Sequence, residues 1–239
     1  MASSPALDSA RTLLGAARFV LVLTGAGVSA ESGVPTFRGA GGYWRNRSFQ
    51  ELATPEAFAR DPRLVWDWYL ERRRTIRACE PNAAHRALAA WSRRGAGLLV
   101  TQNVDDLHER AGQREVVHVH GSLWRNRCTR CGTERADDAL EHAALPRSPC
   151  CGAPERPGMV WFGESLPAAA LDAALDAARR ADAVLVVGTS GVVHPAAGFV
   201  EVARRQGARV VDVNPAATEI TADVALRMPA GEALPLLLG

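Results

Sequence analysis

Lysine is absent from this chain of 239 residues, so all 28 of its basic side chains are arginine. Codon usage in a GC-rich genome, which favours arginine and alanine, is the simplest explanation of this bias. One chemical consequence is that the chain has no lysine side chain of its own to be acylated. The formal net charge is only +2, which gives no reason to expect a nucleic-acid partner.

Long apolar runs are absent too. The run at residues 19–23 is far too short to cross a bilayer, and residues 1–17 lack the basic stretch and apolar core of a secretory signal. We therefore expect a cytoplasmic protein with no membrane partner. Hydrophobic residues make up 47% of the chain and charged residues 23%, which is ordinary for a globular protein that buries a core.

Cysteine is scarce, but it is not scattered, because four of the five cysteines lie within residues 128–151. In a protein that we expect in the cytoplasm, such a cluster is more typical of a metal site than of a disulfide framework. The fifth, Cys79, stands alone on an expected helix, where we interpret it as ordinary packing.

Five short apolar segments predict buried strands, at residues 19–24, 98–102, 116–120, 184–188 and 209–213. Helical stretches lie between most of them, at residues 82–93, 168–180 and 195–206. Strands that alternate with helices predict an α/β fold with a doubly wound, Rossmann-like parallel sheet.

Two regions interrupt this alternation. Residues 39–78 are rich in aromatics and arginine, and their Asp61-Pro62 pair is typical of a helix N-cap followed by proline in the first turn. Residues 122–157 hold the cysteine cluster. We predict that these two inserts form a smaller domain, with a helical and a cysteine module, and that residues 1–38, 79–121 and 158–239 form the sheet domain. Ligands of open α/β sheets bind beyond the carboxyl ends of strands, so we expect a cleft between the domains.

A glycine-rich turn, G-A-G-V-S-A at residues 25–30, follows the first expected strand and fits G-x-G-x-x-A. Glycines let the backbone approach a phosphate, and a following helix N-terminus favours the anion. Alone the pattern is weak, because a dehydrogenase also needs an acidic residue at the end of a second strand about 20 positions on. Glu51 is near that distance, but its surroundings do not read as a strand.

The turn continues as E-S-G-V-P-T-F-R, and the whole stretch at residues 25–38 resembles the signature of the sirtuins, a family of NAD-dependent protein deacylases. The resemblance covers the chain from about Ala16 to its C-terminus. It implies that the extra segment is a loop that folds over NAD. Phe37 would shield the reactive ribose carbon, and Arg38 would orient the cofactor.

A second constellation is T-Q-N-V-D at residues 101–105, followed by His120-Gly121 at the end of an expected strand. Singly, an Asn-x-Asp is commonly a helix cap and a lone histidine is commonly structural. Together they resemble two sirtuin motifs. The resemblance implies that Asn103 and Asp105 bind the nicotinamide carboxamide, that Gln102 contacts the neighbouring ribose, and that His120 is the general base.

Further cofactor contacts are implied by the same resemblance, at the glycine-rich turn, a later G-T-S motif and the last loops. They are Gly25, Ala26, Gly27, Ser29, Glu31, Trp44, Gly188, Thr189, Ser190, Asn214 and Ala230. The segment V-W-F-G-E resembles the family's strand-like contact with a substrate peptide, which pairs by β-addition. Its implied substrate-binding residues are Val160, Phe162, Gly163 and Glu164.

The cysteine cluster begins with Cys128-x-x-Cys131, half of a zinc ribbon. The family's second half is another C-x-x-C, but here Ser148 stands at its first position and an extra Cys150 precedes Cys151. Serine is a poor zinc ligand, and structural zinc favours a closed tetrahedral site. Three arrangements stay open: Cys150 and Cys151 both bind, or three cysteines bind with water or another group, or the site is labile or metal-free. We expect one structural zinc per chain.

Tyr69 and Arg72 are spaced i, i+3 and so share one helix face. Alone, they read as a packed tyrosine beside a solvated arginine run. One sirtuin subgroup carries this Y-x-x-R and removes acidic acyl groups, and it also has a small residue where Ala53 stands. An arginine is well suited to the acyl carboxylate. The resemblance therefore implies a desuccinylase and demalonylase that retains some deacetylase activity on acyl-lysine protein substrates.

The implied reaction transfers the acyl group to ADP-ribose and releases nicotinamide and 2′-O-acyl-ADP-ribose. A deacetylase without acidic-acyl preference and a protein mono-ADP-ribosyltransferase remain alternatives. An NAD-sensing module would be favoured if Asn103, Asp105 or His120 were missing, and none is. Hydride transfer explains neither the cysteines nor the F-R loop. The sequence indicates neither the protein targets nor the oligomeric state.

Overall fold

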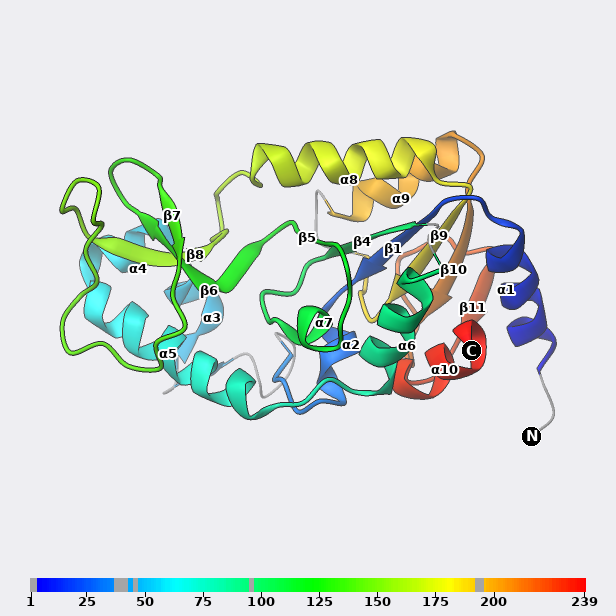
Figure 1. Ribbon diagram of the computed structural model, residues 1–239, viewed down its shortest axis with the longest axis horizontal. Coiled ribbons are helices and arrows are strands. Elements are labelled where there is room, and N and C mark those ends of the chain that lie inside the picture. Colours follow the sequence, from blue (N-terminus) through cyan, green and yellow to red (C-terminus); the bar gives the residue numbers. More distant parts are fainter. Residues whose placement is uncertain (1–3, 37–42, 45–46, 95–96, 192–195) are drawn as a thin grey trace.

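Six parallel strands form the larger sheet of the computed structural model, in the order β11-β10-β9-β1-β4-β5 (Figure 1). They are β1 (Val20–Thr24), β4 (Gly97–Thr101), β5 (Val116–His118), β9 (Ala183–Val187), β10 (Arg209–Val213) and β11 (Val224–Leu226). The structure describes residues 4–36, 43–44, 47–94, 97–191 and 196–239. The expected α/β class with a doubly wound parallel sheet is confirmed.

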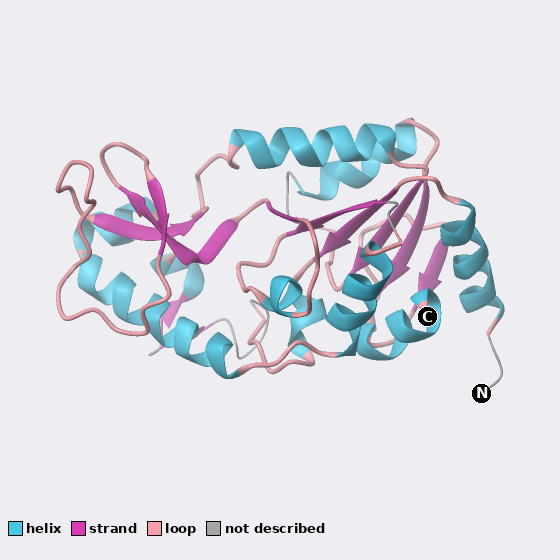
Figure 2. Ribbon diagram, in the orientation of Figure 1, coloured by secondary structure: helices cyan, strands magenta, loops and turns pink. Residues whose placement is uncertain are grey.

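Helices cover both faces of this sheet (Figure 2). One face packs on α1 (Pro5–Ala16), α6 (Ala83–Ser92) and α10 (Ala230–Leu238). The other face packs on α8 (Ala168–Arg180) and α9 (Ala196–Arg205). Every residue of β1 and β9 is buried, because a sheet covered on both faces leaves its central strands no exposed side. None of the helices in the described parts of the chain is long and apolar enough to span a bilayer.

The expected strands agree with the observed ones to within one or two residues. One expectation is wrong in detail, because the strand predicted to end at His120 ends at His118. Val119 still donates its N–H to Thr101 O, but Gly121, with a φ of +72°, then turns the chain out of the parallel sheet. His120 therefore lies in the turn between two sheets and not in a strand.

A smaller, three-stranded antiparallel sheet lies at the other end of the molecule, in the order β7-β6-β8. It consists of β6 (Gly121–Cys128), β7 (Glu134–Ala136) and β8 (Glu155–Met159). Beside it lie α3 (Phe49–Leu52), α4 (Pro55–Arg60), α5 (Pro62–Ala78) and the short pair β2 (Tyr43–Trp44) and β3 (Arg47–Ser48). The side chain of Asp61 caps α5 by accepting from Leu64 N, and Pro62 opens the helix, as predicted. A short helix, α7 (Leu107–Arg110), follows β4.

Arg73 joins α5 to the small sheet from a fully buried position. Its guanidinium donates to Leu123 O at 2.9 Å, to Asn126 Oδ1 at 3.1 Å, and to Asp137 Oδ2 at 2.7 Å. A further bond reaches Ala139 O at 2.9 Å. A buried charge is tolerated only when its donors are satisfied, so this arginine holds the helix and the sheet in one arrangement.

We expect Arg73→Met to lower the free energy of unfolding by about 3–5 kcal/mol, because it leaves the Asp137 carboxylate and several acceptors without their donor. Arg74→Met is the matched control on the same helix, since Arg74 is exposed and makes one bond, to Leu140 O. That variant should lose less than about 1 kcal/mol. Urea unfolding of both variants checks the difference, and equal losses would contradict the role assigned to Arg73.

Candidate active site and metal centre

Two glycine-containing turns meet at the carboxyl edge of the large sheet. Thr24 at the end of β1 pairs with Val187 at the end of β9, so the segments that follow leave side by side. Gly27 donates its N–H to Gly188 O at 2.8 Å, and a Cβ on Gly27 would lie 2.7 Å from Gly188 Cα. Gly188 has a φ of +63°, which favours glycine. The mutual packing of the two turns therefore requires both glycines.

Ser29, Asn103 and Asp105 form one buried polar cluster beside these turns. Ser29 Oγ donates to Asp105 Oδ2 at 3.0 Å and accepts from Asn103 Nδ2 at 3.1 Å. Burial raises the pKa of Asp105, while hydrogen bonds from Leu107 N and Ser29 act in the opposite direction. An amide and a carboxylate are thus held together, which is the donor and acceptor set that a carboxamide needs.

His120 has a defined tautomer. Its Nδ1 lies 3.0 Å from Gln102 O, and a carbonyl can only accept, so Nδ1 carries the proton and Nε2 is the basic nitrogen. Burial lowers the pKa of His120, and the bond to Gln102 O opposes this shift. A neutral imidazole with a free basic nitrogen is the form that a general base needs.

Contacts between loops connect the other predicted cofactor residues. Gln102 donates from Nε2 to Thr189 Oγ1 at 3.0 Å, and Asn214 donates from Nδ2 to Thr189 O at 3.0 Å. A third contact joins the start of α10 to the residue that follows α2. Gly231, which is next to Ala230, donates its N–H to Glu31 Oε2 at 2.7 Å. These residues follow α2 (Ala26–Ala30), β4, β9 and β10, so most of them lie at the edge where open α/β sheets bind ligands.

The remaining predicted cofactor residues divide into two groups. Ala26 begins α2 beside the paired turns, and Ser190 follows Thr189, where its carbonyl accepts from Glu219 N. Phe37 and Arg38 lie outside the described residues, and so does the side chain of Trp44. The predicted roles of these three side chains therefore stay predictions.

Sequence reasoning missed a second layer of polar residues behind the cluster. His85 Nε2 lies 3.4 Å from Ser29 Oγ, and His108 Nε2 lies 3.0 Å from Thr24 Oγ1. The two imidazole rings are 4.8 Å apart. Burial lowers the pKa of His85 to about 4 and that of His108 well below its ordinary value, so both are neutral near pH 7. His85 follows the N-cap Asn82 by three residues, a pattern that does not distinguish it from a structural capping residue.

Tyr69 and Arg72 share one face of α5, as their spacing predicts. Tyr69 is fully buried, and its hydroxyl accepts from Trp161 Nε1 at 2.8 Å. Burial raises the pKa of Tyr69 to about 12, so the hydroxyl keeps its proton. Arg72 is half-buried with its guanidinium 5.3 Å from the centre of the Trp68 ring, and burial lowers its pKa. Tyr69 and Asp105 act on Arg72 electrostatically in the opposite direction, which indicates that Arg72 lies on the side of α5 that faces Asp105.

The V-W-F-G-E segment runs between the predicted base and the tyrosine face of α5. Val160 donates its N–H to His120 O at 2.9 Å, and Phe162 donates its N–H to Ala53 O at 3.0 Å. The side chain of Phe162 is 52% exposed, whereas Ala53 is buried. Gly163 has a φ of +85°, which allows the turn that brings Glu164 back toward the segment. The carboxylate of Glu164 already accepts hydrogen bonds from Arg156 and from the backbone N–H of Trp161. Any contact with a peptide would be made in addition to these bonds.

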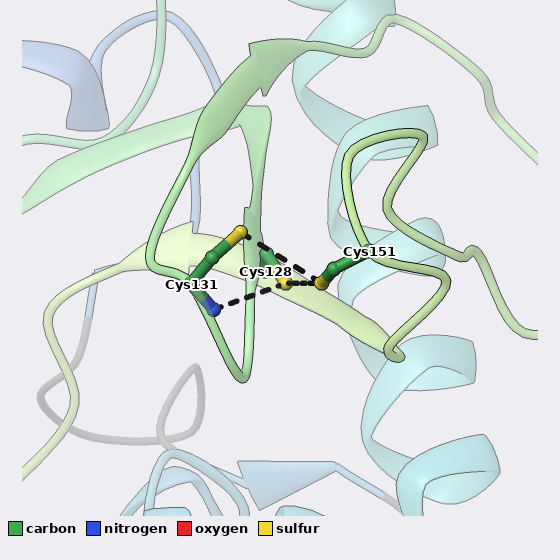
Figure 3. A group of neighbouring side chains, drawn as sticks. All are labelled: Cys128, Cys131 and Cys151. Carbon is green, nitrogen blue, oxygen red and sulfur yellow. Dashed lines mark hydrogen bonds between the residues drawn. The ribbon is translucent and has the colours of Figure 1, made fainter.

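Three cysteines converge in the small sheet, Cys128, Cys131 and Cys151, with their sulfur atoms within 4.8 Å of one another (Figure 3). Cys151 Sγ lies 3.4 Å from Cys128 Sγ and 3.9 Å from Cys131 Sγ. A tetrahedron with Zn–S bonds of about 2.3 Å has S···S edges of about 3.8 Å. The three sulfurs are therefore spaced as zinc ligands are, and much farther apart than the roughly 2.05 Å of a disulfide.

The cysteines come from two turns with the same hydrogen-bond pattern. In the first, Cys128 N donates to Thr133 O and Gly132 N donates to Cys128 O. In the second, Ser148 N donates to Ala153 O and Gly152 N donates to Ser148 O. Gly132 and Gly152 have φ values of +72° and +69°. Ser148, which is buried, thus occupies the position equivalent to Cys128, while Cys150 is exposed and outside the group of three.

Comparison with known proteins identifies the family of this site. The model of the Sir2 family matches residues 25–195. An "NAD-dependent protein deacylase 1" from Pseudomonas aeruginosa is 53% identical over 238 residues, 95% of each chain, and an "NAD-dependent protein deacylase" from Thermococcus kodakarensis is 50% identical over 97% of this chain and 94% of its own. A crystal structure of a Sir2 homologue in complex with NAD superimposes with a TM-score of 0.92 and 45% identity, covering 97% of this chain and 92% of that one. The chain therefore belongs to the Sir2 family, the sirtuins.

Proposed function

We propose that this protein removes acidic acyl groups, succinyl and malonyl, from lysine side chains of protein substrates, with some deacetylase activity retained. As a member of the Sir2 family, the chain is an NAD-dependent protein deacylase. The observation that supports the acyl preference is that the buried Tyr69 hydroxyl and the Arg72 guanidinium share one face of α5, where Tyr69 and Asp105 both act on Arg72 electrostatically.

The preference follows from the chemistry of these two side chains. A guanidinium offers a planar pair of donors that matches a carboxylate. The interaction between the two groups is stronger where water is partly excluded. Arg72 is half-buried and flanked by the Trp68 ring, and the hydroxyl of Tyr69 retains a proton that it can donate. A succinyl or malonyl carboxylate uses both groups, whereas an acetyl methyl uses neither. Ala53 is the small residue that leaves length for the longer acyl chain.

Three groups of residues act in the proposed transfer of the acyl group to ADP-ribose. NAD is a co-substrate that supplies an electrophilic ribose carbon once nicotinamide leaves. Asn103 and Asp105 bind the carboxamide, and Ser29 keeps the two side chains in place. His120 accepts a ribose hydroxyl proton at Nε2, because its Nδ1 proton is engaged by Gln102 O. One water molecule is consumed, and the products are free lysine, nicotinamide and 2′-O-acyl-ADP-ribose.

We expect Arg72→Met to lower kcat/KM for a succinyl-lysine peptide by about 10- to 100-fold, because it removes a charge-assisted contact to the acyl carboxylate. The kcat/KM for NAD-dependent deacylation of the matched acetyl-lysine peptide should change less than about threefold. Product formation with and without NAD, followed by mass spectrometry, measures both rates. Arg74→Met is again the control on the exposed face of α5 and should alter neither.

Equal losses on the two peptides would remove the role given to Arg72 and leave a deacetylase without acidic-acyl preference. ADP-ribosylated protein as the main product, with little deacylation, would instead support the transferase alternative. Both outcomes are read from the same mass spectra, so one set of reactions separates the three activities.

We expect His120→Ala to keep the fold and to reduce deacylation by at least about 100-fold, since it removes the general base. In the parent protein, the pKa of His120 is lowered by burial, so the unprotonated form persists below the ordinary histidine pKa. As pH falls, kcat/KM should therefore decline with a midpoint below about 6.5. A pH–rate profile with its midpoint above that value, or an active His120→Ala variant, would contradict the assignment.

Zinc is the metal we propose for the cysteine group, held by Cys128, Cys131 and Cys151. Thiolates are the ligands that structural zinc prefers, and the role is to fix the two turns of the small sheet. The position equivalent to Cys128 in the second turn belongs to Ser148, so a fourth ligand comes from that serine, from water or from Cys150.

We expect purified protein to hold about one zinc per chain and Ser148→Cys to bind zinc at least tenfold more tightly, because it completes a four-thiolate set. Competition with a chromophoric chelator measures the affinity. Cys150→Ser is the matched variant: unchanged affinity excludes Cys150 as the fourth ligand, and a clear loss identifies it. An affinity of Ser148→Cys equal to that of the parent would show that residue 148 does not face the metal.

A further inference from the structure

Trp161 makes a contact with Tyr69 that the family signature does not explain. Its indole is buried, and its Nε1–H donates to the Tyr69 hydroxyl oxygen at 2.8 Å. An indole N–H is a donor only, so the tyrosine must be the acceptor in this bond. The tyrosine proton then points away from Trp161 and is left for another acceptor.

The indole is itself held from two sides. The Arg156 guanidinium lies 3.3 Å from the centre of the Trp161 ring, and the same guanidinium binds both oxygens of Glu164, at 2.5 and 3.0 Å. Glu164 Oε2 also accepts the backbone N–H of Trp161 at 2.8 Å. Phe58 packs against the indole with a centroid distance of 5.5 Å. Backbone and ring are therefore both fixed, which leaves Nε1 little freedom to leave Tyr69.

This arrangement determines which ligand group the hydroxyl suits. A phenol that accepts an N–H on one side directs its own O–H to another side, where it is available to donate, and donors bind carboxylates. Without the indole N–H, the Tyr69 hydroxyl is free to rotate and to accept a hydrogen bond from the neighbouring Arg72. An arginine N–H bound in this way would no longer be available to the acyl carboxylate. The direction in which the Tyr69 hydroxyl donates thus depends on a residue outside the Y-x-x-R pattern.

We infer that Trp161 is a positioning residue for acyl specificity, which orients the Tyr69 hydroxyl as a donor toward the carboxylate of an acidic acyl-lysine. The inference rests on the proposed preference for succinyl and malonyl groups. It assigns to the indole of the V-W-F-G-E segment a role in choosing the acyl group that is separate from pairing with the substrate backbone.

The test is a double-mutant cycle of Trp161→Phe and Tyr69→Phe, with the ratio of kcat/KM for succinyl-lysine to acetyl-lysine peptides as the readout. Trp161→Phe keeps an aromatic ring and removes the N–H, and it should lower the ratio about five- to tenfold, the value of one buried hydrogen bond. Because the tryptophan acts through the hydroxyl, the double variant should show the ratio of Tyr69→Phe alone.

Trp66→Phe is the matched control. Trp66 lies on α5 with Tyr69, is equally buried, and donates its Nε1–H to Glu155 O at 3.0 Å. The Trp66→Phe variant loses a hydrogen bond of the same kind at a place away from Tyr69. Its free energy of unfolding should therefore fall, while its succinyl-to-acetyl ratio of kcat/KM stays that of the parent. Binding of a fluorescent succinyl-lysine peptide without NAD gives a second readout, and of the two tryptophan variants only Trp161→Phe should weaken that binding.

The outcomes separate this inference from the proposed function. If the parent prefers succinyl and Tyr69→Phe lowers the ratio while Trp161→Phe does not, the inference is overturned and the proposed function stands. Independent, multiplying effects of the two substitutions overturn it as well. A parent without succinyl preference, unaffected in its ratio by Arg72→Met, overturns the proposed function itself. If phenylalanine at 161 prevents folding, site-specific 3-benzothienylalanine, which has sulfur in place of the N–H, provides the same comparison.

Discussion

The parallel pairing of β1 with β4 and β9 is the constraint on which the site depends. Thr24 is in register with Thr101 on one side and with Val187 on the other, so three chain segments leave the sheet at the same height. The glycine-rich turn, the T-Q-N-V-D motif and the G-T-S motif are far apart in sequence, yet this register brings their first residues together. A slip of one residue would reverse the face of every side chain on the strand and separate the motifs.

Burial is the common cause of the electrostatics at this edge. It raises the pKa of Asp105 and lowers those of His85, His108 and His120, because each shift favours the neutral form. The hydrogen bonds of Ser29 and Leu107 N to Asp105 offset part of that cost and fix the carboxylate in place. A polar cluster held this way is rigid before any ligand arrives, which favours binding because less ordering remains to be done.

Much of the fold could be predicted from the sequence because its central strands are continuous apolar runs, such as Val20–Thr24 and Ala183–Val187. The predictions were weakest where tertiary context decides. The end of β5 depends on a turn into another sheet, and α10 contains Pro235, which argues against a helix locally. The motifs identified the candidate site residues, but not His85, His108 or Trp161, since a contact across many residues leaves no local pattern. The sequence shows Ser148 at a position where the family has cysteine, but its equivalence to Cys128 follows only from the matching hydrogen bonds of the two turns.

The residues of α5 proposed to bind the acyl group and the predicted base belong to different parts of the fold, and residues 160–164 connect them. Val160 N binds His120 O, Phe162 N binds Ala53 O, and Trp161 Nε1 binds Tyr69 between these two attachments. The buried Arg73 fixes α5 on the small sheet that leads directly into this segment. Since the same short segment binds His120 O, Ala53 O and the Tyr69 hydroxyl, the main chain sets the separation between His120 and Tyr69. Under the proposed function, α5 would therefore select the acyl group while the residues proposed for the transfer keep their positions.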